Sequence, residues 1–350
     1  MKDVYLKQFK EKERRFFNFF QPLAEEVSSC ESPEVGFRSR AEFGVFIKQN
    51  SLNYFMIKDK KKETLDYLEI CHPKINSLMD ELKNTLRNKT NLLDKLFSCS
   101  FQVSKEGESV ICLNYHKEID QEWEKSATDI ANILKTNLIG RSRKKKITIG
   151  KDFIQENYDL GDENLKINLY ENCFSQPNPY ICEKMLQWTR DAKSHKDDIL
   201  ELHCGIGTFT LLLSRLYKQV LATENSRPSI RGLEDNIKVA ALANISHARL
   251  SGKETLEALN EKRIFRRLSN VNIKDLKLNS VFLDPPRTGL DEYTKTNIKK
   301  FDTIFYISCG FESLQKDLQS IKTHRIKKAS FFDQFPYTDH MESAILLERI

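Results

Sequence analysis

The chain has 350 residues, 39% of them hydrophobic and 30% charged, with a formal net charge of +6 at pH 7. This length suffices for two domains with separate cores, and this balance excludes an intrinsically disordered chain. The basic excess lies in the first part: residues 1–150 hold 27 Lys and Arg against 22 Asp and Glu, whereas residues 151–350 hold 29 against 28. Two basic runs occur there, and each predicts either a phosphate-binding surface or an ordinary solvated face. They are Lys58 with Lys60, Lys61 and Lys62, and Arg141 with Arg143, Lys144, Lys145 and Lys146.

Two further features of the composition concern membranes and metals. The sequence has no run of about 18 apolar residues, and its first residues lack the apolar segment of a signal peptide. The eight cysteines are scattered without a C-x-x-C pair, so neither a zinc site nor an iron–sulfur cluster has its usual spacing. We therefore expect a cytoplasmic protein with reduced thiols, no metal and no membrane contact. We also expect a monomer, although the sequence does not determine the oligomeric state.

The first part of the chain, residues 1–165, mixes helical and extended patterns. It begins with apolar residues at helical spacing among charged ones, then changes to the alternation that is typical of antiparallel strands. This predicts an α+β module. The expected elements are an amphipathic helix over 2–26, strands over 37–47, 52–57 and 110–115, and helices over 75–86 and 123–134.

One of these strands carries two arginines on one face. Arg38 and Arg40 lie two residues apart, so they share a side of the strand, and Phe37, Ala41 and Phe43 point to the other side. Those apolar positions could form a core or a surface on which bases stack, and burial statistics favour the core.

The second part, residues 166–350, repeats the order strand, turn, helix. This alternation predicts an α/β fold, a Rossmann-like and mostly parallel sheet with helices on both faces, and residues 150–175 form the connection to it. The expected strands are 198–202, 219–223, 280–283, 303–307, 325–333 and 344–348, with helices ending at 217 and spanning 228–243.

A candidate cofactor site follows the first of these strands. His203-Cys204-Gly205-Ile206-Gly207 forms a Gly-x-Gly turn that opens a helix, but Thr210 stands where a dinucleotide fingerprint needs its third glycine. Glu224 ends the next strand, a position from which a carboxylate accepts hydrogen bonds from ribose hydroxyls. A nucleoside cofactor without a pyrophosphate fits best, and S-adenosylmethionine is the common one. An ordinary tight turn and a helix-capping carboxylate are the alternatives.

Reactive side chains follow two later strands. Asp284 precedes two prolines that direct its carboxylate over the strand ends, and Cys309 follows the next strand just before a helix. A cysteine near a helix N-terminus has a lowered pKa, which predicts a nucleophile. A structural turn and a buried packing cysteine are the alternatives. Downstream, Glu342 ends the segment 331–342 and offers a base.

Together these segments resemble the TrmA family of bacterial tRNA (uracil-5-)-methyltransferases, in the same order along most of the chain. The resemblance implies an S-adenosylmethionine-dependent enzyme that methylates carbon 5 of uridine 54 in the T-loop of tRNA, with residues 1–165 as an RNA-recognition module that binds the T-arm. It implies Cys309 as nucleophile and Glu342 as base, Gln176, His203, Gly205, Thr208, Glu224 and Asp284 at the cofactor, and Arg287, Arg38 and Arg40 at the substrate. The segments that carry it are FQVSKEGESVICLNYHKEIDQEW, LIGRSRKKKI, ENCFSQPN, LELHCGIGTF, LATE, FLDPPRTGLD, YISC and FFDQFPYTDHMES.

Three other functions stay open at this point. A ribosomal RNA uridine methyltransferase would share the chemistry, although its relatives commonly carry a four-cysteine cluster that this spacing lacks. An RNA-binding folding factor with a decayed site is suggested by His203, Ile206 and Thr208, which depart from the family pattern. An adenine amino-methyltransferase would place an aromatic residue where Arg287 stands.

Overall fold

The computed structural model describes residues 2–192 and 197–350 and divides the chain into two compact units. One unit combines the N-terminal residues up to Ser32 with Tyr158–Ile167 and Tyr180–Ile350, and the other combines Pro33–Asn157 with Asn168–Pro179. The boundary therefore differs from the division predicted at residue 165. The physical reason is that strand β1 (Ala24–Cys30) pairs in parallel with β16 (His324–Phe332), which ties the N-terminus to the C-terminal half.

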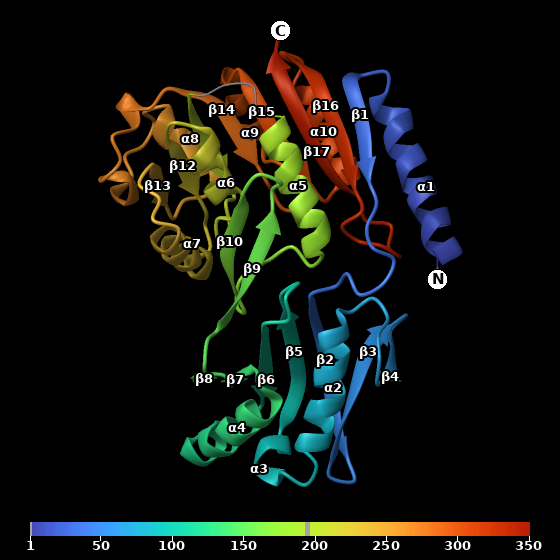
Figure 1. Ribbon diagram of the computed structural model, residues 1–350. Helices are drawn as coiled ribbons and strands as arrows, with labels where there is room; N and C mark the ends of the chain where they lie inside the picture. The colour runs from blue at the N-terminus through green and yellow to red at the C-terminus, as the bar shows by residue number, and fades with distance from the viewer. Residues whose placement is uncertain (1, 193–196) are drawn as a thin grey trace. The chain divides into compact units, whose positions relative to one another are not determined.

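The N-terminal helix is shorter than its sequence pattern predicts. Helix α1 (Lys2–Phe20) ends six residues before Glu26, and the chain turns directly into β1. Its buried aromatic residues recur on one face and join the core of the first unit, where the Phe16 and Phe20 rings lie 4.5 Å apart. Figure 1 shows α1 beside β1 at the edge of the sheet.

The first unit contains an eight-stranded sheet with the order β1-β16-β17-β15-β14-β11-β12-β13. All neighbours that the pairings describe are parallel except β17, which runs antiparallel to both β15 and β16. The mostly parallel sheet is thus as predicted, and the order reverses between β11 and β14. The other strands are β17 (Glu342–Arg349), β15 (Thr303–Ser308), β14 (Leu278–Leu283), β11 (Asp198–Leu202), β12 (Val220–Thr223) and β13 (Ile245–Ala248).

Helices connect these strands, as expected of an alternating α/β fold. The central strands are buried on both faces, for example throughout β11 and β15. The helices are α5 (Pro179–Asp191), α6 (Thr208–Leu216), α7 (Arg227–Val239), α8 (Gly252–Leu259), α9 (Glu292–Asn297) and α10 (Phe311–Ser320).

The second unit is a seven-stranded sheet with the order β4-β3-β2-β5-β6-β7-β8. Phe43 and Ala41 are buried with α2 and α4 residues in its core, which confirms the core interpretation of that strand face, and Phe37 is buried as well. The unit contains β2 (Arg40–Lys48), β3 (Ser51–Lys58), β4 (Lys61–Leu65), β5 (Leu96–Val103), β6 (Ser109–Tyr115), β7 (Asn137–Arg141), β8 (Lys146–Ile149), α2 (Pro73–Thr85), α3 (Thr90–Leu93) and α4 (Gln121–Leu134).

The chain passes between the units through a separate two-stranded sheet. It consists of β9 (Phe153–Asp159) and β10 (Asn164–Tyr170), and each strand has residues in both units. The predicted connection over 150–175 therefore contains both strands of this sheet.

Candidate active site

The loop after β11 is shaped for close approach of a ligand. His203, Gly205 and Gly207 all have positive φ angles, of 62°, 56° and 96°. A side chain on Gly207 would meet the Cδ1 atom of Leu233 at 2.5 Å, whereas nothing lies within 4 Å of the place where Gly205 would carry one. The φ angle at 207 favours glycine whatever the space around it, and the backbone at 205 faces open space.

Acidic groups border this loop at the ends of β11 and β12. The Glu224 carboxylate accepts hydrogen bonds from the backbone N–H groups of Gly205 at 3.2 Å and of Ser226 at 2.7 Å. Glu201, one residue before the end of β11, is buried, and burial together with Asp284 and Glu224 raises its pKa to about 8. Glu201 was not singled out from the sequence. It could have been identified from its position, since it is an acid near the end of a strand and four residues before Gly205, the first glycine of the turn.

This arrangement fits an S-adenosylmethionine molecule. Glu224 lies where ribose hydroxyls would be bound, and Gly205 leaves room beside it. One oxygen of the buried Glu201 carboxyl has no hydrogen-bond partner among the described residues. A cation is the natural partner of such a group, and the cofactor carries both an ammonium and a sulfonium.

The reactive side chains come together through the register of the antiparallel pair at the middle of the sheet. Ser308 of β15 is paired with Ser343 of β17, so the next residues, Cys309 and Glu342, are also neighbours. Asp284 follows the adjacent strand β14, and its backbone N–H lies 3.4 Å from the carbonyl of Leu202. Three chain segments therefore deliver a thiol and two carboxyls to one edge of the sheet.

The electrostatics of this group differ from the sequence prediction. Burial, Glu342 and Asp284 raise the pKa of the Cys309 thiol to about 11, whereas a lowered pKa was predicted from the helix N-terminus that follows. Burial and the two carboxyls outweigh the helix, and the positive charge of Arg287 acts in the opposite direction.

Both carboxyls are harder to ionise than usual. Burial, with a smaller contribution from Glu224, raises the pKa of Asp284 to about 7. Glu342 is only 2% exposed, and burial and the charge of Asp284 raise its pKa well above the usual range. Such clustering of perturbed acids is typical of catalytic sites.

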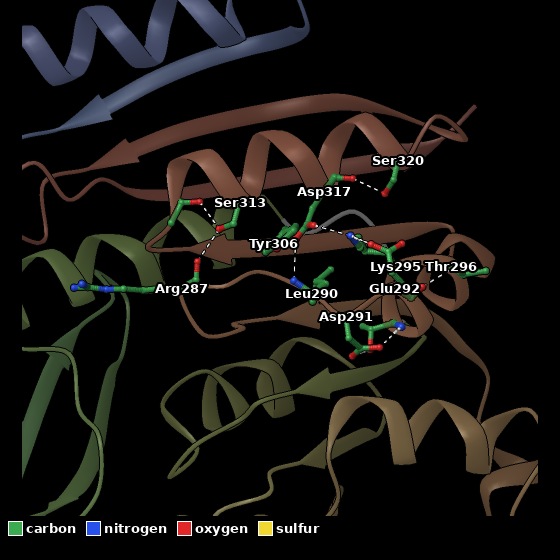
Figure 2. Close-up of polar contacts among 12 residues, drawn as sticks. Arg287, Leu290, Asp291, Glu292, Lys295, Thr296, Tyr306, Ser313, Asp317 and Ser320 are labelled. Atoms are coloured by element: carbon green, nitrogen blue, oxygen red, sulfur yellow. Dashed lines mark hydrogen bonds and ion pairs between the residues drawn. The ribbon is translucent and has the colours of Figure 1, made fainter.

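The loop that carries Arg287 is fixed by α10 (Figure 2). The Asp317 carboxylate accepts hydrogen bonds from the Leu290 N–H at 2.9 Å and from the Tyr306 hydroxyl at 2.6 Å. The Ser313 hydroxyl donates to the carbonyl of Arg287 at 2.8 Å. Figure 2 shows that the Arg287 side chain extends away from this cluster. The backbone is therefore held by α10, while the guanidinium lies 5.9 Å from the centroid of the Phe335 ring.

Of the remaining predicted site residues, Thr208 is the first residue of α6, and Arg38, Arg40 and Gln176 belong to the second unit. Arg40 donates from its guanidinium to the carbonyls of Cys173 at 2.5 Å and Glu171 at 2.6 Å, and Arg38 donates to the carbonyl of Arg40 at 3.0 Å. Arg40 thus orders the chain near Gln176, which is buried. Their contact with RNA, and that of Gln176 with the cofactor, remain predictions.

The described residues contain neither a metal-binding cluster nor a membrane-spanning helix. In residues 2–192 and 197–350, no group of three or more His, Cys, Asp or Glu side chains is placed to hold a metal ion. Across the same residues, no helix is both long enough and apolar enough to span a bilayer.

The order of the C-terminal strands, the Gly-x-Gly loop after β11 and the acid after β12 define a class I methyltransferase that uses S-adenosylmethionine. The family described as tRNA (Uracil-5-)-methyltransferase matches residues 4–350, and the chain belongs to this family.

Similar proteins agree with this assignment. A tRNA/tmRNA (uracil-C(5))-methyltransferase of Nitratiruptor sp. is 40% identical over 91% of this chain and 88% of its own length, and one of Acinetobacter baumannii is 41% identical over 95% of each. Among solved structures, the Pyrococcus abyssi tRNA (uracil-54, C5)-methyltransferase in complex with S-adenosyl-L-homocysteine shares the fold, with a TM-score of 0.76 at 18% identity. That similarity covers 98% of this chain and 83% of the other.

Proposed function

We propose that this S-adenosylmethionine-dependent tRNA uracil-C5 methyltransferase acts on uridine 54 in the T-loop, through a covalent bond between Cys309 and carbon 6 of the uracil. The observation that carries the proposal is the register of β15 and β17, which makes Cys309 and Glu342 neighbours. The relatives named for uracil-C5 methylation and the Pyrococcus abyssi enzyme named for uracil 54 support the substrate.

Carbon 5 of uracil is a poor nucleophile, so the ring must first be activated. The Cys309 thiolate adds to carbon 6, which moves the electrons of the C5=C6 bond to carbon 5 and the carbonyl. The bound cofactor supplies an electrophilic methyl group on a sulfonium. Once carbon 5 carries the methyl group, Glu342 removes the hydrogen on carbon 5 as a proton. The C5=C6 bond then reforms and the sulfur leaves carbon 6.

The perturbed acidities suit these two roles in different ways. The high pKa of Glu342 makes it a strong base once it has lost its own proton. The high pKa of Cys309 means that little thiolate is present before the substrate binds. Arg287 stabilises the thiolate, and its guanidinium can also neutralise negative charge on the uracil carbonyl.

The remaining parts of the proposal concern the RNA. A uracil in a folded loop cannot present carbon 6 to a thiol, so it must be extruded, at a cost of a few kcal/mol. The contacts that offset this cost are assigned to the second unit, because the lysines of its two basic runs are exposed. Arg38 and Arg40, a monomeric state and a cytoplasmic location belong to the same proposal.

The test uses a T-arm hairpin with 5-fluorouridine at position 54, together with S-adenosylmethionine. Fluorine at carbon 5 cannot be removed as a proton, so the protein should remain bonded to the RNA in a band that survives denaturation. We expect the bonded peptide to contain Cys309, and Cys309→Ala to give no band. Cys30→Ala is the matched control, because Cys30 and Cys309 are the two cysteines that are not buried. A band that persists in Cys309→Ala would refute the covalent scheme.

A further inference from the structure

The loop that leads to Glu342 is fastened to the N-terminal helix. Residues 333–341 connect β16 to β17, and Glu342 is the first residue of β17. The amide of Gln8 on α1 contacts two successive residues of this loop: it donates to the carbonyl of Thr338 at 2.7 Å and accepts from the N–H of Tyr337 at 2.7 Å. One side chain thus satisfies a backbone donor and a backbone acceptor, as a neighbouring strand would.

A buried ion pair fastens the start of the same loop. The Lys12 ammonium lies 2.9 Å from the Asp333 carboxylate and donates at 3.0 Å to the carbonyl of Phe335. The side chains of Lys12 and Asp333 are 7% and 0% exposed. Breaking a buried pair leaves an uncompensated charge, so this contact strongly favours one position of the loop.

The contacts are arranged along one face of α1. Tyr5, Gln8, Phe9 and Lys12 follow the i, i+3, i+4, i+7 spacing of a single helix face. The Phe9 ring stacks on Phe331 with a centroid distance of 5.6 Å, and the Tyr5 ring lies 6.0 Å from that of Tyr337. This face therefore contacts the end of β16 through Phe9 and the loop through polar side chains and the Tyr5 ring.

The loop conformation needs such support. Tyr337 has a φ angle of 63°, in the left-handed region that disfavours a bulky side chain. The Tyr337 N–H donates the hydrogen bond that the Gln8 side-chain oxygen accepts. Without Gln8 the backbone has less reason to keep this conformation, and Glu342 lies only five residues further along the chain.

We propose that α1 is a positioning element for catalysis, in which Gln8 and Lys12 hold the 333–341 loop so that Glu342 reaches the proton on carbon 5. The inference rests on the proposed role of Glu342 as the base. In this proposal α1, which lies more than 320 residues before Glu342 in the sequence, affects only the step in which the proton is removed.

Gln8→Ala is the decisive variant, because Gln8 is half-buried and its loss leaves no buried charge, whereas replacing Lys12 would strand Asp333. Asn18→Ala is the matched control, an amide removed from the exposed side of the same helix. Methylation of a T-arm hairpin is measured with hydrogen or deuterium on carbon 5 of the target uridine. Amide hydrogen exchange of the peptide covering 333–341 is measured on the same proteins.

We expect Gln8→Ala to turn over about tenfold more slowly, with a larger deuterium isotope effect and with the covalent adduct accumulating on ordinary uridine. Its KM for the RNA and its rate of adduct formation with 5-fluorouridine should be unchanged, and amides of the loop should exchange faster. Asn18→Ala should match the unaltered protein in every measurement.

An unchanged isotope effect or unchanged exchange in Gln8→Ala would overturn the inference, as would an equal slowing of adduct formation with 5-fluorouridine. If the unaltered protein fails to methylate the hairpin, the proposed function fails instead. Hydrogen exchange would still decide whether α1 holds the loop.

Discussion

The reactivity of the Cys309 thiol depends on its burial and on three neighbouring side chains. Burial and the carboxyls of Glu342 and Asp284 raise its pKa to about 11, and Arg287 lowers it. Because only the thiolate attacks carbon 6, the fraction ionised at a given pH limits the first chemical step. Removing a carboxyl should raise the ionised fraction, and removing the Arg287 guanidinium should lower it.

We predict that Asp284→Asn lowers the pKa of Cys309 and speeds its alkylation by iodoacetamide at pH 8 by roughly threefold to tenfold, since a fall of one in the pKa gives about ten times more thiolate. Asp284 has a pKa of about 7, so it is mostly ionised at pH 8 and its charge opposes the thiolate. Arg287→Met removes a positive charge and should slow the same reaction.

Peptide mapping supplies an internal control for this experiment. Cys30 is also partly exposed, and burial raises its pKa, but neither Asp284 nor Arg287 is among the groups that act on it. Its alkylation rate should therefore be the same in all three proteins. If Asp284→Asn and Arg287→Met changed the Cys309 rate in the same direction, the electrostatic account of the thiol would be wrong.

Among the elements, α10 has a structural role that its sequence does not reveal. Asp317 is 3% exposed and accepts hydrogen bonds from the Leu290 N–H and the Tyr306 hydroxyl, so it links the loop after β14 to β15 (Figure 2). Lys295 lies 3.5 Å from the other carboxylate oxygen. The carboxylate therefore depends on three partners that come from separate elements.

We predict that Tyr306→Phe lowers the free energy of unfolding of the first unit by about 1.5–3 kcal/mol, the usual contribution of a hydrogen bond to a charged group. Denaturant unfolding of both proteins measures it. Tyr293→Phe is the matched control in the same unit, because the Tyr293 hydroxyl has a long contact of 3.4 Å with Asn260 and should cost much less. If Tyr306→Phe and Tyr293→Phe lowered the free energy of unfolding equally, the hydrogen bond between Tyr306 and Asp317 would have no special stabilising role.

Elements determined by local sequence signals could be predicted, whereas those determined by contacts between distant segments could not. Strands β11, β12, β14 and β15 were expected near their observed positions because short apolar runs bounded by polar or turn residues are local signals. Strand β1 was missed because its partner, β16, lies about 300 residues away. The insertion of β17 between β15 and β16, which makes Cys309 and Glu342 neighbours, is equally non-local.

The same distinction holds for the candidate site. Cys309, Glu342 and Asp284 could be named from their segments, but the raised pKa of Cys309 could not, because it depends on carboxyls that arrive from other strands. Glu201 was missed since a single acid inside an apolar strand is not distinctive until its burial is known. The contacts of α1 with the 333–341 loop connect opposite ends of the chain and leave no local signal.

At the scale of the whole molecule, the two units divide the work that the proposed reaction requires. The first unit contains the thiol, the carboxyls and the candidate cofactor loop, whereas the second contains both basic runs. The run at Lys58–Lys62 lies on the edge hairpin β3–β4, where the Lys62 ammonium sits 4.5 Å from the centroid of the Phe55 ring. Ile57 in the same hairpin is 71% exposed. Exposed lysines beside aromatic and apolar side chains favour RNA as the partner of this surface.

We predict that Lys60→Glu with Lys61→Glu weakens binding of a T-arm hairpin and reduces the slope of log affinity against log salt by about 1 for each phosphate that the protein no longer neutralises. The cause is that fewer counterions are released when fewer phosphates are neutralised, so the loss should be largest at low salt. Fluorescence anisotropy at several salt concentrations measures both quantities. Lys316→Glu with Lys322→Glu makes the same change in net charge at exposed positions of the first unit, and S-adenosylmethionine binding tests the fold of each variant. If both pairs lowered affinity and slope equally, net charge alone would explain the effect, and the hairpin would have no special part in holding the RNA.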